Sequence, residues 1–431
     1  MTGSTRSVPD TGALRAFLDA CPTPWHAAET AAGLLDAAGF EAQALEAPFD
    51  ATRRRSYVRR GGSLIAWQTG EGANARTPMR IAAAHTDSPG FRIKPRPESV
   101  VAGAVRLGVE VYGGPLLNSW LDRDLGIAGT VLVGTGSALE IRPVIDSDAL
   151  LRIPQLAIHL DRSVNDTGLK LDRQKHLPLL WGLDDGSGDF TSYVAELAGV
   201  AASQVRGWDL MPFDLTPARV CGRQGELLAS ARLDDLLSCH AAIEALVQTE
   251  STDEVTAVVA LVDHEEVGST SSTGADGTFV PQIIERIASA SADGERNDFL
   301  VAMASSHAVS LDMAHATHPN HPERHDPGHT VLLDGGPVVK HNAQQRYATS
   351  LASMAPFLAA CDAADVAVQH FVSHSEMPCG STIGPALGSG LGIGVVDVGV
   401  AQLAMHSVRE VCGSSDHGRL SRALTRYLSQ T

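Results

Sequence analysis

The chain alternates between short apolar runs and stretches with helical spacing. The stretches "MRIAAAHTDSPG" (79–90) and "EVTAVVALVD" (254–263) are apolar runs that end in polar turns, which predicts buried strands. In "RLDDLLSCHAAIEALV" (232–247) the apolar residues recur at helical spacing, and "TPWHAAETAAGLLDAAGF" (23–40) begins with Thr and Pro and ends in Gly, as helices do. Further strands are predicted at 307–314 and 366–373, and a further helix at 401–412. Strands that alternate with helices predict an α/β domain with a largely parallel sheet.

The middle of the chain has a different pattern. In "AVRLGVEVYGG" the side chains of Val105, Leu107, Val109 and Val111 alternate with polar or small residues, as they do in a half-buried strand. The stretch 129–144 has the pattern of a hairpin. This part of the chain is therefore predicted to be rich in β-structure.

These patterns predict two domains. A β-rich domain at 96–229 is inserted into a discontinuous domain formed by 1–95 and 230–431. The length of 431 residues also suits about two domains. The inserted domain holds most of the tryptophans, an enrichment that fits either an interface or a small core. They are Trp120, Trp181 and Trp208.

Charge and composition narrow the function. The formal net charge of −17 argues against nucleic acid or an anionic membrane as a partner, and it means that an acidic substrate would need a local cation. No apolar run approaches a membrane span, and the first residues contain no apolar segment of a secretory leader. The six cysteines include no CxxC pair, which fits reduced thiols. We therefore expect a cytoplasmic protein.

Residues that can bind metal collect where predicted strands end or helices begin. In an α/β sheet such ends form the usual site. Each residue also has a structural reading, since Asp87 and Asp234 could cap turns or helices, His406 could be a buried histidine, and the glutamates could lie in a solvated loop. Together, two histidines and several carboxylates suit zinc, cobalt or manganese. The set is His85, Asp87, Asp234, Asp235, Glu265, Glu266, Asp312 and His406.

The adjacent glutamates in "LVDHEEVGST" (261–270) need a physical reason, because two neighbouring carboxylates repel each other and resist burial. At a strand end one of them can bind a cation while the other stays free as a general base. The number of carboxylates makes two metals that share a bridging aspartate plausible. A helical HExxH site is excluded, because the fourth residue after His264 is Gly268.

Six motifs together resemble the aspartyl aminopeptidases, the M18 family of zinc metallopeptidases. They are "AAAHTDSPGFRIKP", "RLDDLLSC", "DHEEVGS", "DMAHATHPN", "GPVVKHNAQQRYAT" and "VDVGVAQLAMHSVRE", in order between about residues 20 and 420. The resemblance implies a catalytic domain with a central mixed sheet flanked by helices, two zinc ions per subunit, and an inserted dimerisation domain. It also implies a cytosolic exopeptidase that removes N-terminal Asp or Glu from peptides and assembles as a tetrahedral homododecamer.

Residue roles carry over by the same resemblance. His85, Asp234 and Asp312 are expected to hold one zinc, and Asp234 is expected to bridge to a second zinc held by Glu266 and His406, although "RLDD" leaves Asp235 as the competing bridge. Glu265 is expected to be the general base, and Asp87 to orient His85. Lys340 matches a lysine near the acidic side chain of the substrate, with Arg346 and Lys94 as alternatives. His159 matches a histidine lent to a neighbouring subunit's site.

Two other functions remain open. A related two-metal aminopeptidase of broad or apolar specificity would share the metal ligands. An inactive scaffold built on a peptidase fold would be expected to lack the base or a ligand, whereas every position is filled here. A panel of substrates would distinguish the broad-specificity enzyme from an acidic-specific one. A measurement of metal content would distinguish the scaffold from an enzyme.

Overall fold

A computed structural model describes residues 9–184, 189–290 and 295–430. By the contacts between residues, the chain forms two compact units. The smaller unit consists of Ser88–Pro217 and His406–Arg409, and the larger unit takes the rest. The predicted inserted domain, 96–229, has different borders, because the first strand of the smaller unit already begins at Gly90 and the strands between 219 and 230 pair within the larger unit.

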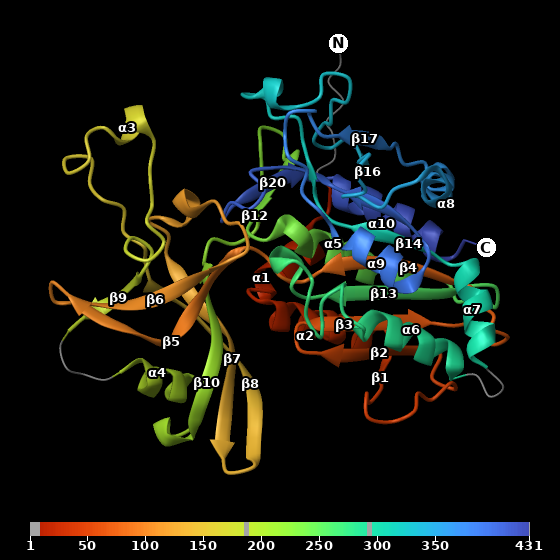
Figure 1. Ribbon diagram of the computed structural model, residues 1–431, viewed down its shortest axis with the longest axis horizontal. Coiled ribbons are helices and arrows are strands. Elements are labelled where there is room, and N and C mark those ends of the chain that lie inside the picture. The colour runs from red at the N-terminus through yellow and green to blue at the C-terminus, as the bar shows by residue number, and fades with distance from the viewer. Residues whose placement is uncertain (1–8, 185–188, 291–294, 431) are drawn as a thin grey trace. The chain divides into compact units, whose positions relative to one another are not determined.

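The larger unit is built on a mixed sheet. Within the described residues it has nine strands, and Figure 1 shows β13 running beside β3. The central strands β13, β4, β14 and β18 are parallel to one another, whereas β3 and β16 run antiparallel to their neighbours β13 and β18. The sheet order is β1 (Glu41–Ala42), β2 (Arg55–Arg60), β3 (Ser63–Gln68), β13 (Thr256–Val262), β4 (Met79–His85), β14 (His307–Leu311), β18 (Gly394–Gly399), β16 (Val338–His341) and β17 (Gln369–Val372).

Helices cover both faces of this sheet. Successive side chains of a strand point to opposite faces, so on β13 Val259 packs into one core while Val258 and Ala260 pack into the other. Full burial of a side chain such as Ile284 in the second core contributes about 1.5–3 kcal/mol. The first core is covered by α1 (Gly12–Ala20), α2 (Pro24–Ala37), α5 (Leu233–Gln248), α8 (Leu351–Ala363) and α10 (Asp416–Leu428), and the second by α6 (Phe279–Ser289), α7 (Arg296–Ala304) and α9 (Ile383–Leu391).

A second sheet of the larger unit corrects one prediction. The helix predicted at 401–412 is wrong, because Gln402 pairs with Cys412 and Leu403 with Val411 in two antiparallel strands. The prediction failed because the apolar residues of these two strands, read in sequence order, recur at a spacing close to that of a helix. The sheet order is β11 (Arg219–Cys221), β12 (Leu227–Ser230), β20 (Glu410–Gly413), β19 (Ala401–Leu403) and β15 (Ala314–His315).

The smaller unit is rich in β-structure, with a core of its own. The predicted hairpin at 129–144 is confirmed by β7 and β8. Trp120 contacts Phe91, and Trp181 and Trp208 contact Phe190, so these tryptophans pack within this unit's core. Its elements are β5 (Gly90–Val101), β6 (Ala104–Tyr112), β7 (Leu125–Thr135), β8 (Ala138–Leu151), α3 (Val164–Thr167), β9 (Leu179–Leu183), α4 (Phe190–Leu197) and β10 (Val205–Asp214).

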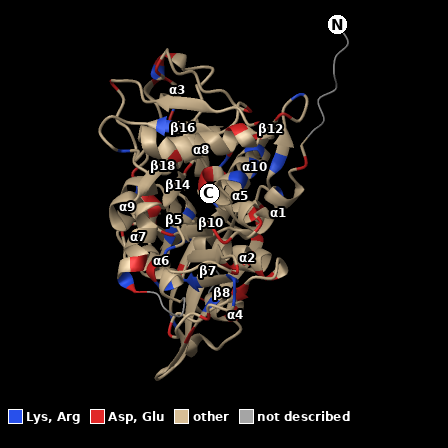
Figure 2. Ribbon diagram, turned by 90° about the vertical axis from the view of Figure 1, so that its right-hand side faces the viewer, with Lys and Arg blue, Asp and Glu red and all other residues tan. Residues whose placement is uncertain are grey.

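Charged residues of both signs are interspersed along the helices and loops (Figure 2). Among the helices that the structure describes, none combines the length and the apolar composition that crossing a bilayer requires.

Candidate metal centre

The register of three parallel strands brings the predicted site residues to one edge of the large sheet. Val262 on β13 lies opposite His85 on β4, and Ser310 on β14 lies opposite Ala83. The residues that follow these strands therefore emerge side by side. This is the carboxyl edge of the parallel strands, where α/β proteins gather their sites.

His85, Asp234 and Asp312 form a buried group. They offer ligand atoms that all lie within 4.8 Å of one another. His85 Nε2 is 3.4 Å from Asp234 Oδ1, and 1% of the His85 side chain is exposed. An imidazole nitrogen with carboxylate oxygens is a donor set that zinc binds.

The electrostatics of this group favour a cation. Burial would lower the pKa of His85, but hydrogen bonds to Asp234 and Asp87 and the charge of Asp235 outweigh it, so that this pKa stands well above its ordinary value. Burial raises the pKa of Asp312 and, still further, that of Asp235. Buried carboxylates in excess are costly unless a positive charge accompanies them. The residues present therefore fit a divalent metal.

Asp87 connects His85 to the glutamate turn. Its backbone oxygen lies 3.0 Å from His85 Nδ1, while its carboxylate is 3.5 Å from that nitrogen. The carboxylate accepts hydrogen bonds from the backbone N–H groups of Glu265, at 3.0 Å, and Glu266, at 3.1 Å. Asp87 thus contacts the imidazole mainly through its backbone and fixes the position of both glutamates with its side chain.

The glutamate turn follows β13 as a short 3-10 helix, Glu265–Val267. His264 before it and Gly268 after it have left-handed backbone angles, φ 67° and 96°. Both glutamates are half-buried, and their carboxylates group with His85 within 4.8 Å. Burial raises the pKa of Glu265 to about 7, opposed by the charge of His85 and reinforced by Asp312 and Asp234.

The two aspartates that open α5 have different surroundings. The side chain of Asp234 faces His85 Nε2, and its backbone N–H donates to Glu410 Oε2 at 3.0 Å. The side chain of Asp235 instead accepts the backbone N–H of His85 at 3.2 Å. Of the two, Asp234 alone belongs to a described group that could hold a metal, and Asp235 supports the backbone of His85.

Lys340 lies deep in the larger unit. Its side chain is 3% exposed and its Nζ is 3.2 Å from Asp312 Oδ1. The same Nζ donates to the backbone oxygen of Met313 at 2.9 Å and lies 5.3 Å from the centre of the Tyr347 ring. Arg346, by contrast, is exposed.

Three other predicted site residues belong to the smaller unit. Lys94 donates to Gln174 at 3.1 Å, and His159 is exposed in a turn. His406 has its Nδ1 3.1 Å from the backbone oxygen of Gly114. The roles predicted for them stay predictions.

Two residues next to the group of His85, Asp234 and Asp312 were not predicted from the sequence. Glu410 is 2% exposed and accepts a hydrogen bond from the backbone N–H of Asp234. Its signal in the sequence is a charged residue at an inward position of β20, a strand that lies in the stretch predicted to be a helix. Gly399 ends β18 so close to β14 that a Cβ atom there would lie 2.1 Å from the backbone oxygen of Asp312. No local sequence pattern shows that this position must be glycine.

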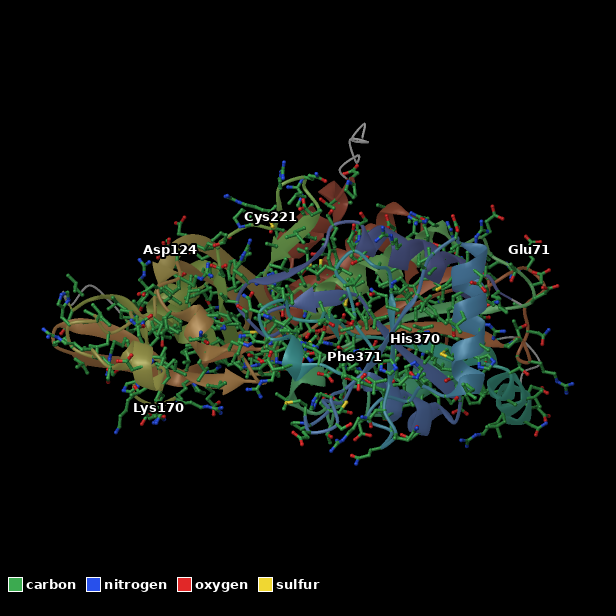
Figure 3. The ribbon with its side chains drawn as sticks, turned by 90° about the horizontal axis from the view of Figure 1, so that it is seen from above. Glu71, Asp124, Lys170, Cys221, His370 and Phe371 are labelled. Atoms are coloured by element: carbon green, nitrogen blue, oxygen red, sulfur yellow. The ribbon has the colours of Figure 1, made fainter. Side chains whose placement is uncertain are left out.

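A cavity of about 220 Å³ lies beside Tyr347, the residue whose ring faces Lys340. Phe371, labelled in Figure 3, lies on β17 and lines it together with Met377. Basic groups also line this cavity. They are His315, Arg324, His325 and His374.

The chain is similar to known proteins in both sequence and fold. The family model described as "Aminopeptidase I zinc metalloprotease (M18)" matches residues 17–427. The chain is 47% identical over 421 residues to the "Probable M18 family aminopeptidase 2" of Streptomyces coelicolor, and the match covers 96% of each. A chain in the cryo-EM structure of the Ape4 and Nbr1 complex has a TM-score of 0.92 and 33% identity, covering 97% of this chain and 85% of that one. A chain of the S. cerevisiae mApe1 dodecamer has a TM-score of 0.83 and 28% identity, covering 96% of this chain and 95% of that one.

Proposed function

The chain belongs to the M18 family of zinc metalloproteases and is a metallo-aminopeptidase, and from this premise we propose that it removes N-terminal Asp or Glu from peptides with two zinc ions per subunit. The observation that carries the proposal is the buried group of His85, Asp234 and Asp312 beside the glutamate turn held by Asp87.

We assign the ligands as follows. His85, Asp234 and Asp312 would hold one zinc, and Asp234 would be shared with a second zinc that Glu266 and His406 would also hold. Co²⁺ or Mn²⁺ can substitute, because the donors are nitrogen and oxygen. When bound, zinc supplies Lewis-acid polarisation of a carbonyl and lowers the pKa of water.

Glu265 acts as the general base in this proposal. It takes a proton from the attacking water and passes it to the leaving amine, which requires a carboxylate with a free lone pair near the scissile carbonyl. Its neighbour Glu266 serves as a ligand, and the two N–H bonds from the turn to Asp87 keep the two carboxylates in their separate positions. Asp87 therefore positions the base and the ligand together.

Selectivity for an acidic side chain needs a cation at short range, because the net charge of −17 repels acidic peptides at long range. Lys340 supplies it. Of its three N–H donors, Met313 and Asp312 engage two, which leaves a third for a substrate carboxylate. The cavity lined by basic side chains lies beside Tyr347, whose ring centre is 5.3 Å from Lys340 Nζ.

A panel of aminoacyl anilides tests the substrate class. We expect higher kcat/KM for aspartyl and glutamyl than for leucyl and alanyl substrates, together with zinc retained by the purified protein. Equal or greater turnover of leucyl substrate would favour the broad-specificity alternative, for which Phe371 and Met377 give the cavity an apolar wall. Bound zinc without turnover of any member would favour a scaffold.

The variant Lys340→Met tests the selecting cation. Losing a charge-assisted contact costs about 1.5–3 kcal/mol, so kcat/KM for an aspartyl substrate should fall about ten- to a hundredfold while that for an alanyl substrate hardly changes. The exposed Arg346→Met is the matched control, and we expect it to leave both values near wild type. An equal loss on both substrates in Lys340→Met would move the selectivity to Arg346, Lys94 or His159.

We also propose that the chain assembles with itself. One neighbour of this fold is a dodecamer, so a homododecamer in which the β-rich smaller unit makes the dimer contact and His159 reaches a neighbouring subunit's site is the expected assembly. The cytoplasm is the proposed location, since the cysteines at 21, 221, 239, 361, 379 and 412 are free thiols.

A further inference from the structure

A second group of metal-binding side chains lies between helices α5 and α10, which pack against each other in the larger unit (Figure 1). His240 and Glu244 are one turn apart on α5 and therefore share a face of that helix. His417 is the second residue of α10. The three offer ligand atoms within 4.8 Å of one another, and none belongs to the groups around His85 in the part of the chain that the structure describes.

The two imidazoles face each other nitrogen to nitrogen. His240 Nδ1 lies 2.8 Å from His417 Nε2, and one of these two nitrogens carries the shared hydrogen. Glu244 Oε2 lies 3.9 Å from the same nitrogen of His417. The ring of Phe17 packs edge-on against His240 at 5.2 Å and closes one side of the pair.

Burial keeps both rings neutral. It lowers the pKa of His240, and it lowers that of His417 to about 3, helped by the neighbouring His240. Neutral imidazole is the form that binds metals. The Glu244 side chain is 33% exposed, which gives an ion a route to the pair.

We propose that His240, His417 and Glu244 form an additional site for a divalent transition metal such as zinc, separate from the catalytic pair. Two imidazole nitrogens and one carboxylate are a frequent zinc donor set, with water completing the coordination. At Zn–N distances of about 2.1 Å, two tetrahedral nitrogens lie about 3.4 Å apart, so the rings must separate by about 0.6 Å and Glu244 must approach by a similar amount. The shared hydrogen moves to the other nitrogen of its own ring, so binding releases no proton from the pair.

The site would link α5, whose first turn contains Asp234 and Asp235, to α10. A metal that binds the folded form but not the unfolded chain stabilises the folded form in proportion to its occupancy. The metal would therefore act as a cross-link between two helices, with no part in the reaction.

The experiment counts tightly bound metal. The full chain is stripped with a chelator, reloaded with Zn²⁺ or Co²⁺, separated from free metal and measured by elemental analysis and by the visible absorption of Co²⁺. His417→Gln should hold one equivalent less than wild type, and His307→Gln, the same change at a half-buried histidine on β14, should hold the wild-type number. Equal metal content in folded wild type and folded His417→Gln would overturn the proposal.

Three further variants keep the test decisive. Glu244→Gln changes a partly exposed side chain and should weaken Co²⁺ binding at this site at least tenfold, so unchanged binding would overturn the proposal even if His417→Gln did not fold. Asp312→Asn should lose one catalytic metal but keep this equivalent, and Zn²⁺ should raise its Tm by more than it raises that of the double variant Asp312→Asn/His417→Gln, whereas an equal rise in the two would contradict the proposal. Failure of the substrate proposal would leave this metal count unchanged.

Discussion

At the scale of single residues, Asp87 fixes the positions of the two adjacent glutamates that follow a buried strand. Its carboxylate accepts both backbone N–H groups of the turn, while its backbone oxygen contacts His85. The position of Glu265 relative to Glu266 is therefore set by backbone hydrogen bonds, which neither glutamate side chain has to supply. Changing either side chain should leave the turn in place.

This gives a prediction for the glutamate pair. Glu265→Gln should nearly abolish turnover while metal content stays close to that of wild type, because the proposed base is not a ligand. Glu266→Gln should lower both metal content and activity. Elemental analysis beside kcat on an aspartyl substrate makes the comparison, and a Glu265→Gln variant that retained most of its rate would show that another group is the base.

At the scale of elements, the site depends on how closely β18 approaches β14. Gly399 has no room for a side chain, since a Cβ atom would lie 2.1 Å from the backbone oxygen of Asp312. Any larger residue must push the end of β14 away and move Asp312 with it. A residue that touches no substrate thus controls the placement of a proposed ligand.

We predict that Gly399→Ala weakens metal binding and activity and costs about 1–3 kcal/mol of stability through the forced backbone shift. The control is Gly33→Ala on α2, where a new Cβ meets nothing within 4 Å, and where the helix should gain about 0.5–1 kcal/mol. The Tm and the metal content of each variant are measured and compared with those of wild type. Wild-type values for Gly399→Ala would mean that β18 can move without disturbing Asp312.

At the scale of the whole molecule, the proposed assembly predicts complementation between inactive subunits. Glu265→Gln and His159→Ala are each expected to be inactive. In random 1:1 mixing, half of the dimers are mixed and one of the two sites in each mixed dimer is intact, so about a quarter of wild-type activity should return. Capture through an affinity tag on one variant, followed by detection of the untagged variant in the captured material, confirms that the oligomers are mixed. A mixture that stays inactive although its oligomers have exchanged subunits would argue against a shared site.

Much of the fold and the site could be predicted from the sequence, because strands buried on both faces are continuous apolar runs and the polar residues that follow them must lie at their ends. The runs before His85 and Asp263 and the helix after Arg232 gave the central strands and α5 correctly. The same local pattern marked His85, Asp234 and Asp312 as candidate ligands, and the structure brings these three side chains together. The motif resemblance also gave the family.

Only the tertiary structure decided what depends on long-range pairing. The stretch 401–412 is two strands because Gln402 and Leu403 find partners in Cys412 and Val411, which no local period reveals. The site depends on contacts between residues more than eighty positions apart in the chain. These contacts turn Asp234 toward His85, attach its backbone to Glu410 and leave no room for a side chain at Gly399. The meeting of His240 with His417 is of the same kind. Sequence spacing determines which side chains share one element, whereas contacts between elements are determined by how the sheet and helices pack.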